Sequence, residues 1–148
     1  MIVATPIPRC HTAELRVTLG REGVGLGNAE RPVYFRNVGR HVCFVYGYAG
    51  FGLEDAQHRV QRSQVHWGPT YFGGYWKKRR VVLRPGQSAR TILAWGHVSG
   101  PGENQYQCEP ISEWLEVTPP DERTFVRVRF HDTVCGHGFM SSPPLRAG

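Results

Sequence analysis

Hydrophobic and polar residues alternate with a period of two in short runs along this chain, and residues typical of turns separate the runs. Such alternation indicates half-buried β-strands, whereas no run keeps the 3.6-residue period of a helix for more than two turns. Seven strands with many turns predict an all-β sandwich or barrel. The clearest strands are expected at 14–19, 32–37, 42–47, 79–83, 89–95, 114–117 and 124–130.

The faces of these strands follow from the same alternation. In the strand predicted at 124–130, the side chains at positions 124, 126, 128 and 130 are expected in the core. Those of Arg127 and Arg129 are expected to point to solvent. Trp95 and Trp114 lie within predicted strands and are also expected in the core.

The length of 148 residues predicts one domain with enough apolar residues to bury its own core. Because both ends carry proline, we expect an extended arm at 1–9, a single domain at 10–140 and an extended arm at 141–148. No apolar stretch reaches the roughly 20 residues that cross a bilayer, so the chain is not expected to span a membrane. The first residues also lack the charged and apolar regions of a signal peptide.

Cationic side chains outnumber acidic ones, 18 to 12, which gives a formal net charge of +6. Residues 1–100 hold 14 basic and 5 acidic side chains, whereas 101–148 hold 4 basic and 7 acidic ones. Arginine, which pairs with carboxylates and phosphates in a bidentate manner, accounts for 16 of the 18 cations. This asymmetry suits an anionic partner, and the alternative is a solvated basic surface.

The four cysteines contain no C-x-x-C pair, which argues against a zinc ribbon or a thioredoxin-type motif. Their even number and wide spacing favour two disulfides formed in an oxidising compartment, and the alternative is four buried thiols in a cytosolic protein. They are Cys10, Cys43, Cys108 and Cys135.

The predicted strand pairs suggest which cysteines bond to each other. Antiparallel pairing of the first two predicted strands would bring Cys10 and Cys43 to the same end of the sandwich. A hairpin of the last two predicted strands would bring Cys108 and Cys135 together at its open end. We therefore expect these two bonds, one of the three connectivities that four cysteines allow.

One segment interleaves aromatic planes with four consecutive cations and forms the candidate binding surface. Its aromatic rings could stack on a ligand while its cations meet anionic groups, so the expected partner is a protein or an anionic envelope polymer. In the alternative interpretation the aromatics cover the core edge and the cations protect an edge strand. Nucleic acid is not expected, because no recognised nucleic-acid-binding signature accompanies the segment. Trp67, just before it, is expected to be partly exposed. The candidate residues are Tyr71, Tyr75, Trp76, Lys77, Lys78, Arg79 and Arg80.

Recognisable catalytic motifs are absent from the sequence. It has no G-x-S-x-G elbow, no P-loop and no pair of carboxylates in a catalytic pattern, and Glu54 and Asp55 are expected in a loop. Of the seven histidines only His131 and His137 lie near another potential ligand, Cys135, which could not bind metal as a thiolate once oxidised. We therefore expect no catalytic residues, no metal site, no cofactor and no enzymatic activity.

Several short motifs follow one another along residues 10–145. An N-x-G turn precedes a cysteine, then come a G-Y-x-G-x-x-L-x-D segment and an L-x-P-G-x-S-A turn, and a cysteine stands near each end. These three motifs occupy 36–39, 47–55 and 82–89, and two further segments of the pattern follow them, C-E-P at 108–110 and L-E-V-T-P-P at 115–120. In this order, and with these cysteines, they resemble a family of small disulfide-bonded domains of unknown function in exported proteins and lipoproteins of actinobacteria.

The resemblance implies an immunoglobulin-like antiparallel β-sandwich of about seven to nine strands, with two disulfides and a location outside the cytoplasm. It implies no catalytic residues. We therefore expect a non-enzymatic binding or structural module of an actinobacterial cell envelope or secretome. Because the chain shows no signal peptide, the alternative is a virion-surface component of an actinobacterial phage, such as a capsid decoration or tail-associated protein. Such a component would form a homo-oligomer or bind capsid or tail proteins.

Overall fold

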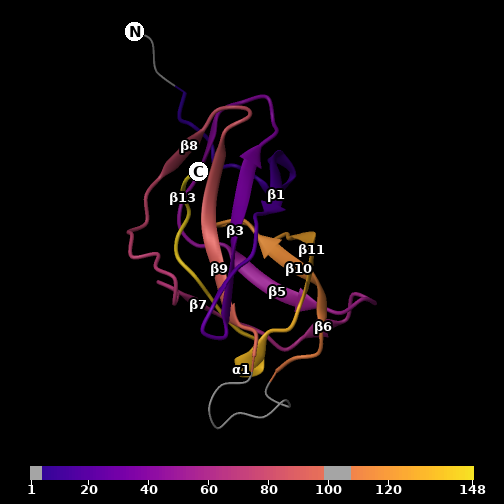
Figure 1. The fold of residues 1–148 in the computed structure, drawn as a ribbon. Coiled ribbons are helices and arrows are strands. Elements are labelled where there is room, and N and C mark those ends of the chain that lie inside the picture. Colours follow the sequence, from indigo (N-terminus) through magenta and orange to yellow (C-terminus); the bar gives the residue numbers. More distant parts are fainter. Residues whose placement is uncertain (1–4, 99–107) are drawn as a thin grey trace.

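The regular structure of the described residues is almost entirely β, as the alternating pattern predicts. A computed structural model describes residues 5–98 and 108–148 (Figure 1). Two short helical segments accompany the strands, η1 (Thr12–Glu14) and α1 (Cys135–Gly138), and no described helix is long and apolar enough to cross a membrane. The strands are β1 (Leu15–Leu19), β2 (Gly23–Gly25), β3 (Asn28–Asn37), β4 (Cys43–Val45), β5 (Gly50–Glu54), β6 (Val60–Gln61), β7 (Gln64–Trp67), β8 (Val81–Leu83), β9 (Ser88–Gly96), β10 (Ser112–Thr118), β11 (Val126–Asp132), β12 (Phe139–Ser142) and β13 (Arg146–Ala147).

The largest sheet is built around the long strands β3 and β9. Its order is β1-β3-β9-β12-β7, with β2 paired to β3 and β13 paired to β9. Along β3 and β9 most of the buried residues lie two positions apart, so one face of this pair packs on the core. Phe35 stands opposite Ala89, and Ala29 stands opposite Trp95, and all four side chains are at most 2% exposed.

A second sheet, in the order β11-β10-β5-β6, and a two-stranded sheet of β4 and β8 share this core. The core joins Phe35 from the first sheet, Leu53 and Leu115 from the second, and Leu83 from the third. Full burial of each such side chain contributes about 1.5–3 kcal/mol to folding. In Figure 1, β5 and β10 run obliquely to the upright β3 and β9. Sheets packed around one core agree with the predicted sandwich.

The expected strand pairs and disulfides are confirmed. β1 pairs antiparallel with β3, and β10 pairs antiparallel with β11. The first pair places Cys10 beside Cys43, and the second places Cys108 beside Cys135, and both disulfides are formed. Strand pairing read from the sequence was therefore sufficient to assign both bonds.

Trp114 lies outside the core, which corrects the sequence-based expectation. Trp95 is buried as expected, but Trp114 is only half-buried and contacts the His58 ring and the Arg129 guanidinium. Leu115 takes the neighbouring core position in β10, so the alternation turns Trp114 to the opposite face.

The strand expected at 79–83 is shorter in the structure. Only Val81–Leu83, strand β8, pairs with a neighbour, and residues 77–80 have no regular structure. The four cations therefore do not form an edge strand, and the interpretation that they protect one is wrong. Their side chains are exposed on an irregular segment instead.

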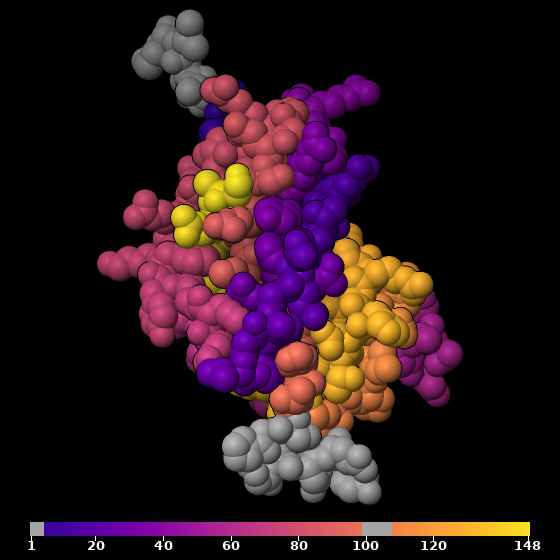
Figure 2. Space-filling model, viewed as in Figure 1, coloured from indigo at the N-terminus to yellow at the C-terminus, as the bar shows by residue number. Residues whose placement is uncertain are grey.

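The C-terminal residues, expected as an extended arm from 141 onward, are part of the first sheet. β12 pairs antiparallel with β9 but parallel with β7, so the sandwich is not purely antiparallel, and β13 pairs with β9. Met140 and Leu145 are fully buried, and the Leu145 amide donates to the Gly47 carbonyl. Strands this short carry too few alternating residues to be recognised. In Figure 2 the yellow C-terminal atoms are surrounded by pink atoms from the middle of the chain.

The expected N-terminal arm is partly attached to the domain. Residues 1–4 lie outside the described residues. Arg9 forms an isolated bridge with Phe44 and a 2.8 Å salt bridge with Glu122. The end of this arm therefore lies against the domain.

Candidate functional site

The candidate segment 71–80 begins with a tight turn. Thr70 and Gly73 exchange two backbone hydrogen bonds, of 2.6 and 3.1 Å. Gly73 (φ 122°) and Gly74 (φ 99°) adopt backbone conformations that favour glycine. A Cβ on Gly74 would lie 2.9 Å from the Pro143 ring, so glycine also permits close approach to the C-terminal segment. The turn therefore places the following residues beside the end of the chain.

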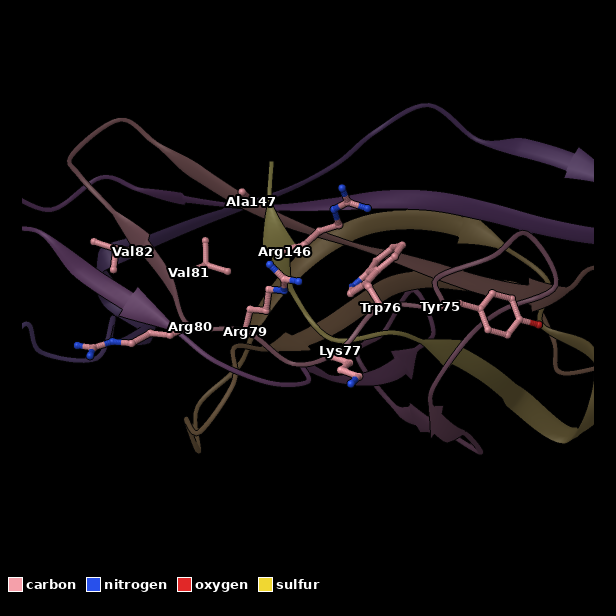
Figure 3. A pocket seen from close by; sticks show the side chains of 9 residues that line it. All are labelled: Tyr75, Trp76, Lys77, Arg79, Arg80, Val81, Val82, Arg146 and Ala147. Atoms are coloured by element: carbon pink, nitrogen blue, oxygen red, sulfur yellow. The ribbon is translucent and has the colours of Figure 1, made fainter.

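These residues line a surface cavity of about 790 Å³, which we call the basic groove (Figure 3). The Trp76 indole N–H donates to the Pro144 carbonyl over 2.7 Å, and the Arg146 guanidinium lies 4.7 Å from the indole ring centroid. These two contacts hold the indole against the C-terminal segment. The lining residues are Tyr75, Trp76, Lys77, Arg79, Arg80, Val81, Val82, Arg146 and Ala147.

The basic groove carries four cations that no acidic side chain neutralises. Within the part of the chain that the structure describes, Lys77, Arg79, Arg80 and Arg146 form no salt bridge with a carboxylate. The Arg80 guanidinium packs over the Phe44 ring at 4.1 Å from its centroid, a contact that leaves the charge in place. Uncompensated like charges around one concave surface create a positive potential that attracts anions.

Five of the seven candidate residues line the basic groove, and two do not. Lys78 lines a second cavity, and Tyr71 packs edge-on against Phe72 and lines neither cavity. Sequence analysis missed Arg146, which reaches the basic groove because β13 pairs with β9. No local pattern in the sequence indicates that pairing.

Lys78 lines a second cavity, of about 510 Å³, which we call the aromatic cleft. The Trp67 indole stacks on the Tyr48 ring, with centroids 5.3 Å apart and an interplanar angle of 11°, and its N–H donates to the Ala49 carbonyl over 3.0 Å. Trp67 is nevertheless 56% exposed, which confirms the expectation of partial exposure. The other lining residues are Tyr46, Gly47, Gly50, Thr118, Pro119, Asp121 and Glu122.

Two glutamates form a hydrogen-bonded pair on the second sheet. Glu54 is 1% exposed at the end of β5, and Glu116 lies on the neighbouring strand β10, opposite Gly52. Burial opposes ionisation of Glu54, but hydrogen bonds with Glu116, Arg127 and His58 outweigh burial and lower its pKa to about 2. Burial and the hydrogen bond with Glu54 raise the pKa of Glu116 to about 7. At mildly acidic pH the pair therefore holds one proton.

This glutamate pair corrects the expectation that Glu54 lies in a loop. The Glu54 carboxylate accepts 2.8 Å hydrogen bonds from the Arg127 guanidinium and from His58, so it is an anchored strand residue. Glu116 is far from Glu54 in the sequence and reaches it only through the pairing of β5 with β10. Spacing in the sequence therefore gave no signal for the pair.

We expect the free energy of unfolding to fall as the pH rises from 4.5 to about 7. The folded state raises the pKa of Glu116 from 4.5 to about 7, so its contribution is fully present below pH 4.5 and is lost as the pH passes 7. Glu116 is partly exposed, and solvent screening weakens its interactions, so the change in the free energy of unfolding is on the order of 1 kcal/mol. Urea unfolding at pH 5 and pH 8 measures it.

The matched variant for this experiment is Glu116→Gln, which can still donate a hydrogen bond to Glu54 but does not titrate. In this variant the free energy of unfolding should differ less between pH 5 and pH 8 than it does in the unaltered protein. Some difference should persist, since the hydrogen bond with Asp132 also raises the pKa of Glu22 to about 7. An unchanged difference in the variant would contradict the assignment to Glu116.

The histidines and cysteines near the C-terminus are engaged in other contacts. Cys135 is bonded to Cys108, and His131 Nδ1 lies 2.9 Å from the Glu113 carboxylate. His137 Nδ1 lies 3.4 Å from the Arg62 guanidinium. Across 5–98 and 108–148, no group of three or more histidine, cysteine, aspartate or glutamate side chains is placed to hold a metal ion.

Comparison with known proteins gives one family. A family model described as a domain of unknown function, DUF4232, matches residues 10–148. Comparison with curated proteins and with solved structures finds no match. The matched range contains both disulfides and all the residues that line the basic groove and the aromatic cleft. Because the match begins at Cys10 and continues to the last residue, the chain belongs to the DUF4232 family.

Proposed function

We propose that this protein is a non-enzymatic, extracytoplasmic binding module that binds an anionic polymer of an actinobacterial cell envelope in the basic groove. The observation that carries the proposal is the set of four cations without carboxylate partners around one cavity, within the described residues. The two disulfides support a location outside the cytoplasm, because such bonds persist in oxidising compartments.

The arrangement of these cations suits a polymer better than a single small anion. Lys77, Arg79 and Arg80 follow one another along the chain, and Arg146 comes from a different strand beside Trp76. A polymer with repeated negative charges could reach several of them at once, and arginine forms paired hydrogen bonds with phosphate or carboxylate oxygens. Figure 3 shows Tyr75 and Arg80 toward opposite ends of the row of lining side chains.

The composition of the groove supports binding rather than chemistry. Its lining contains cationic, aromatic and aliphatic side chains but no carboxylate, histidine, serine or cysteine. Those are the side chains that most often act as general bases or nucleophiles. The glutamate pair of Glu54 and Glu116 does not line this groove.

The double variant Lys77→Gln with Arg79→Gln is expected to lower the affinity for cell wall isolated from the organism of origin. The two substitutions remove two charges that would form hydrogen bonds with the polymer, so we expect the affinity to fall about tenfold or more at low ionic strength. Because screening weakens exposed charge pairs, the affinity of the unaltered protein should fall as salt is added. Cosedimentation with the wall measures both effects.

The control for net charge removes two exposed arginines outside both cavities, in Arg21→Gln with Arg84→Gln. This control should bind nearly as well as the unaltered protein. Equal weakening by both double variants would show that total charge, and not the groove, determines binding. Unchanged binding by the groove variant would also reject the proposal.

A further inference from the structure

The basic groove and the aromatic cleft lie on two sides of one chain segment. Lys77 and Arg79 line the basic groove, while Lys78, between them in the sequence, lines the aromatic cleft. Consecutive Cα atoms are about 3.8 Å apart, so the two cavities share a wall only one segment thick. A flexible polymer that crosses residues 77–79 would therefore meet both cavities.

The aromatic cleft holds a fixed stacking surface. One face of the Trp67 indole is stacked on Tyr48, and its N–H is bound to the Ala49 carbonyl, so contacts on two sides define the side-chain position. More than half of Trp67 is nevertheless exposed. An aromatic surface that is already ordered binds a flat apolar face without losing further side-chain freedom.

Polar groups with no protein partner surround this surface. Within the described residues, the side chains of Tyr46, Thr118 and Asp121 form no hydrogen bond or ion pair, and the Lys78 ammonium group only approaches the rings of two tyrosines. Glu122, in contrast, already accepts hydrogen bonds from residues of the N-terminal segment. The cleft thus presents free donors, free acceptors, one cation and two carboxylates, of which only Asp121 is without a partner among the described residues.

This combination fits a sugar ring. The C–H face of a pyranose can stack on an indole, and its hydroxyls both donate and accept, as required by Asp121, Lys78 and the tyrosine and threonine hydroxyls. A lone anion would be repelled by Asp121. A purely apolar segment would cover Lys78 and Asp121 without offering them partners, which is unfavourable.

We propose that the aromatic cleft binds a sugar unit of the same polymer whose anionic groups occupy the basic groove. The ligand class is therefore an anionic polysaccharide. This inference rests on the proposed function for the identity of the polymer. The sugar-binding role of the cleft is tested separately from the role of the groove.

The experiment uses three probes on the full chain. They are the anionic polysaccharide of the isolated cell wall, the neutral polysaccharide fraction of the same wall, and inorganic polyphosphate, which contains no sugar. Trp67→Ala should weaken binding of the anionic polysaccharide about tenfold and remove binding of the neutral fraction. It should leave polyphosphate binding unchanged. Isothermal titration calorimetry measures all three affinities.

Two further variants separate the effect of the ring from an effect on folding. Trp67→Phe keeps an aromatic ring and should retain part of the sugar affinity. Phe125→Ala removes another exposed aromatic ring, one that lines neither cavity, and should bind all three probes like the unaltered protein. Thermal unfolding of each variant shows whether the fold is intact.

The outcomes distinguish the two proposals. Sugar binding by the cleft is rejected if Trp67→Ala leaves both polysaccharide affinities unchanged, or if it weakens polyphosphate binding equally. If Lys77→Gln with Arg79→Gln changes no affinity while the Trp67 effects hold, the groove proposal fails and the cleft proposal stands. Failure of the unaltered protein to bind any of the three probes rejects both.

Discussion

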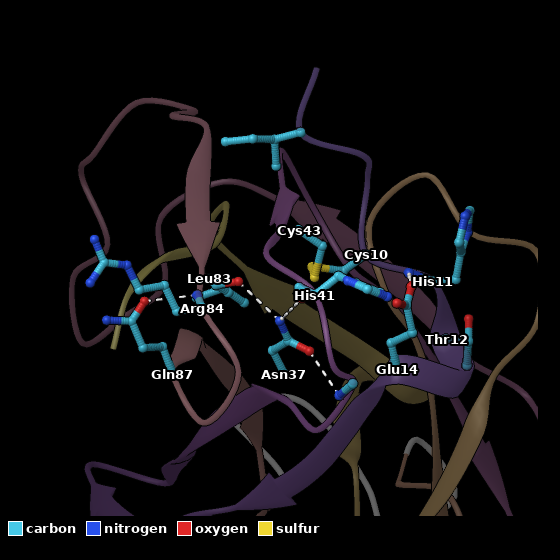
Figure 4. The surroundings of a disulfide bond; sticks show 12 residues. Cys10, His11, Thr12, Glu14, Asn37, His41, Cys43, Leu83, Arg84 and Gln87 are labelled. Carbon is cyan, nitrogen blue, oxygen red and sulfur yellow. Dashed lines mark hydrogen bonds between the residues drawn. A yellow bond between two sulfur atoms is a disulfide. The ribbon is translucent and has the colours of Figure 1, made fainter. Parts of the chain in front are cut away.

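Replacing Asn37 with alanine is expected to lower the free energy of unfolding by about 3 kcal/mol. Asn37 is fully buried, and its amide nitrogen donates to the His41 carbonyl over 2.8 Å and to the Leu83 carbonyl over 2.9 Å (Figure 4). Its side-chain oxygen accepts a 2.9 Å hydrogen bond from the Gly39 amide. One side chain therefore connects β3, the turn after it and β8. Alanine would leave buried backbone groups without partners, and urea unfolding measures the cost.

Two comparisons identify the cause of this loss. Asn37→Asp keeps the size and the acceptor but removes the donated hydrogen bonds, so it should also be strongly destabilising. Asn28→Ala removes an asparagine whose 3.3 Å hydrogen bond to the Leu26 carbonyl is exposed, and it should change the stability by less than about 0.5 kcal/mol. Similar losses in Asn37→Ala and Asn28→Ala would contradict the buried role of Asn37.

Removing the disulfide between Cys10 and Cys43 is expected to cost about 3 to 4 kcal/mol of unfolding free energy. The bond joins residues 33 positions apart, so it limits the conformations of the unfolded chain. Both sulfurs belong to residues that are at most 1% exposed, so alanine is the suitable replacement because serine would bury a hydroxyl. Urea unfolding of Cys10→Ala with Cys43→Ala, under non-reducing conditions, gives the value.

The second disulfide provides the comparison for this variant. Cys108 and Cys135 stay bonded in it, so the unaltered protein under reducing conditions, which loses both bonds, should be less stable than the variant. A variant as stable as the oxidised unaltered protein would show that the Cys10–Cys43 bond does not contribute to folding stability.

The parts of the fold that could be predicted depend on local alternation. β1, β3, β10 and β11 each show enough alternating residues to be placed and paired, and their pairing led directly to both disulfides. β12 and β13 are too short for such a pattern, and prolines lie between them, so their place in the first sheet could not be seen. Trp114 illustrates a second limit, because alternation gives two faces without stating which is buried.

The candidate site was predictable only where its residues are consecutive. The run from Tyr75 to Arg80 attracts attention as a sequence, and five of its residues line the basic groove. Arg146 and the glutamates Glu54 and Glu116 take their positions from strand pairing between distant segments. Their chemistry depends on neighbours that a linear pattern does not reveal.

Because synthesis runs from the N-terminus, β12 and β13 leave the ribosome after the other described strands. Both pair with β9, and Met140 and Leu145 are buried in the core, so the largest sheet cannot be completed before Ala147 has been made. A nascent chain that has not reached Leu145 therefore leaves core surface exposed. Until β12 and β13 have been made, the edge of β9 that they cover lacks its pairing partners.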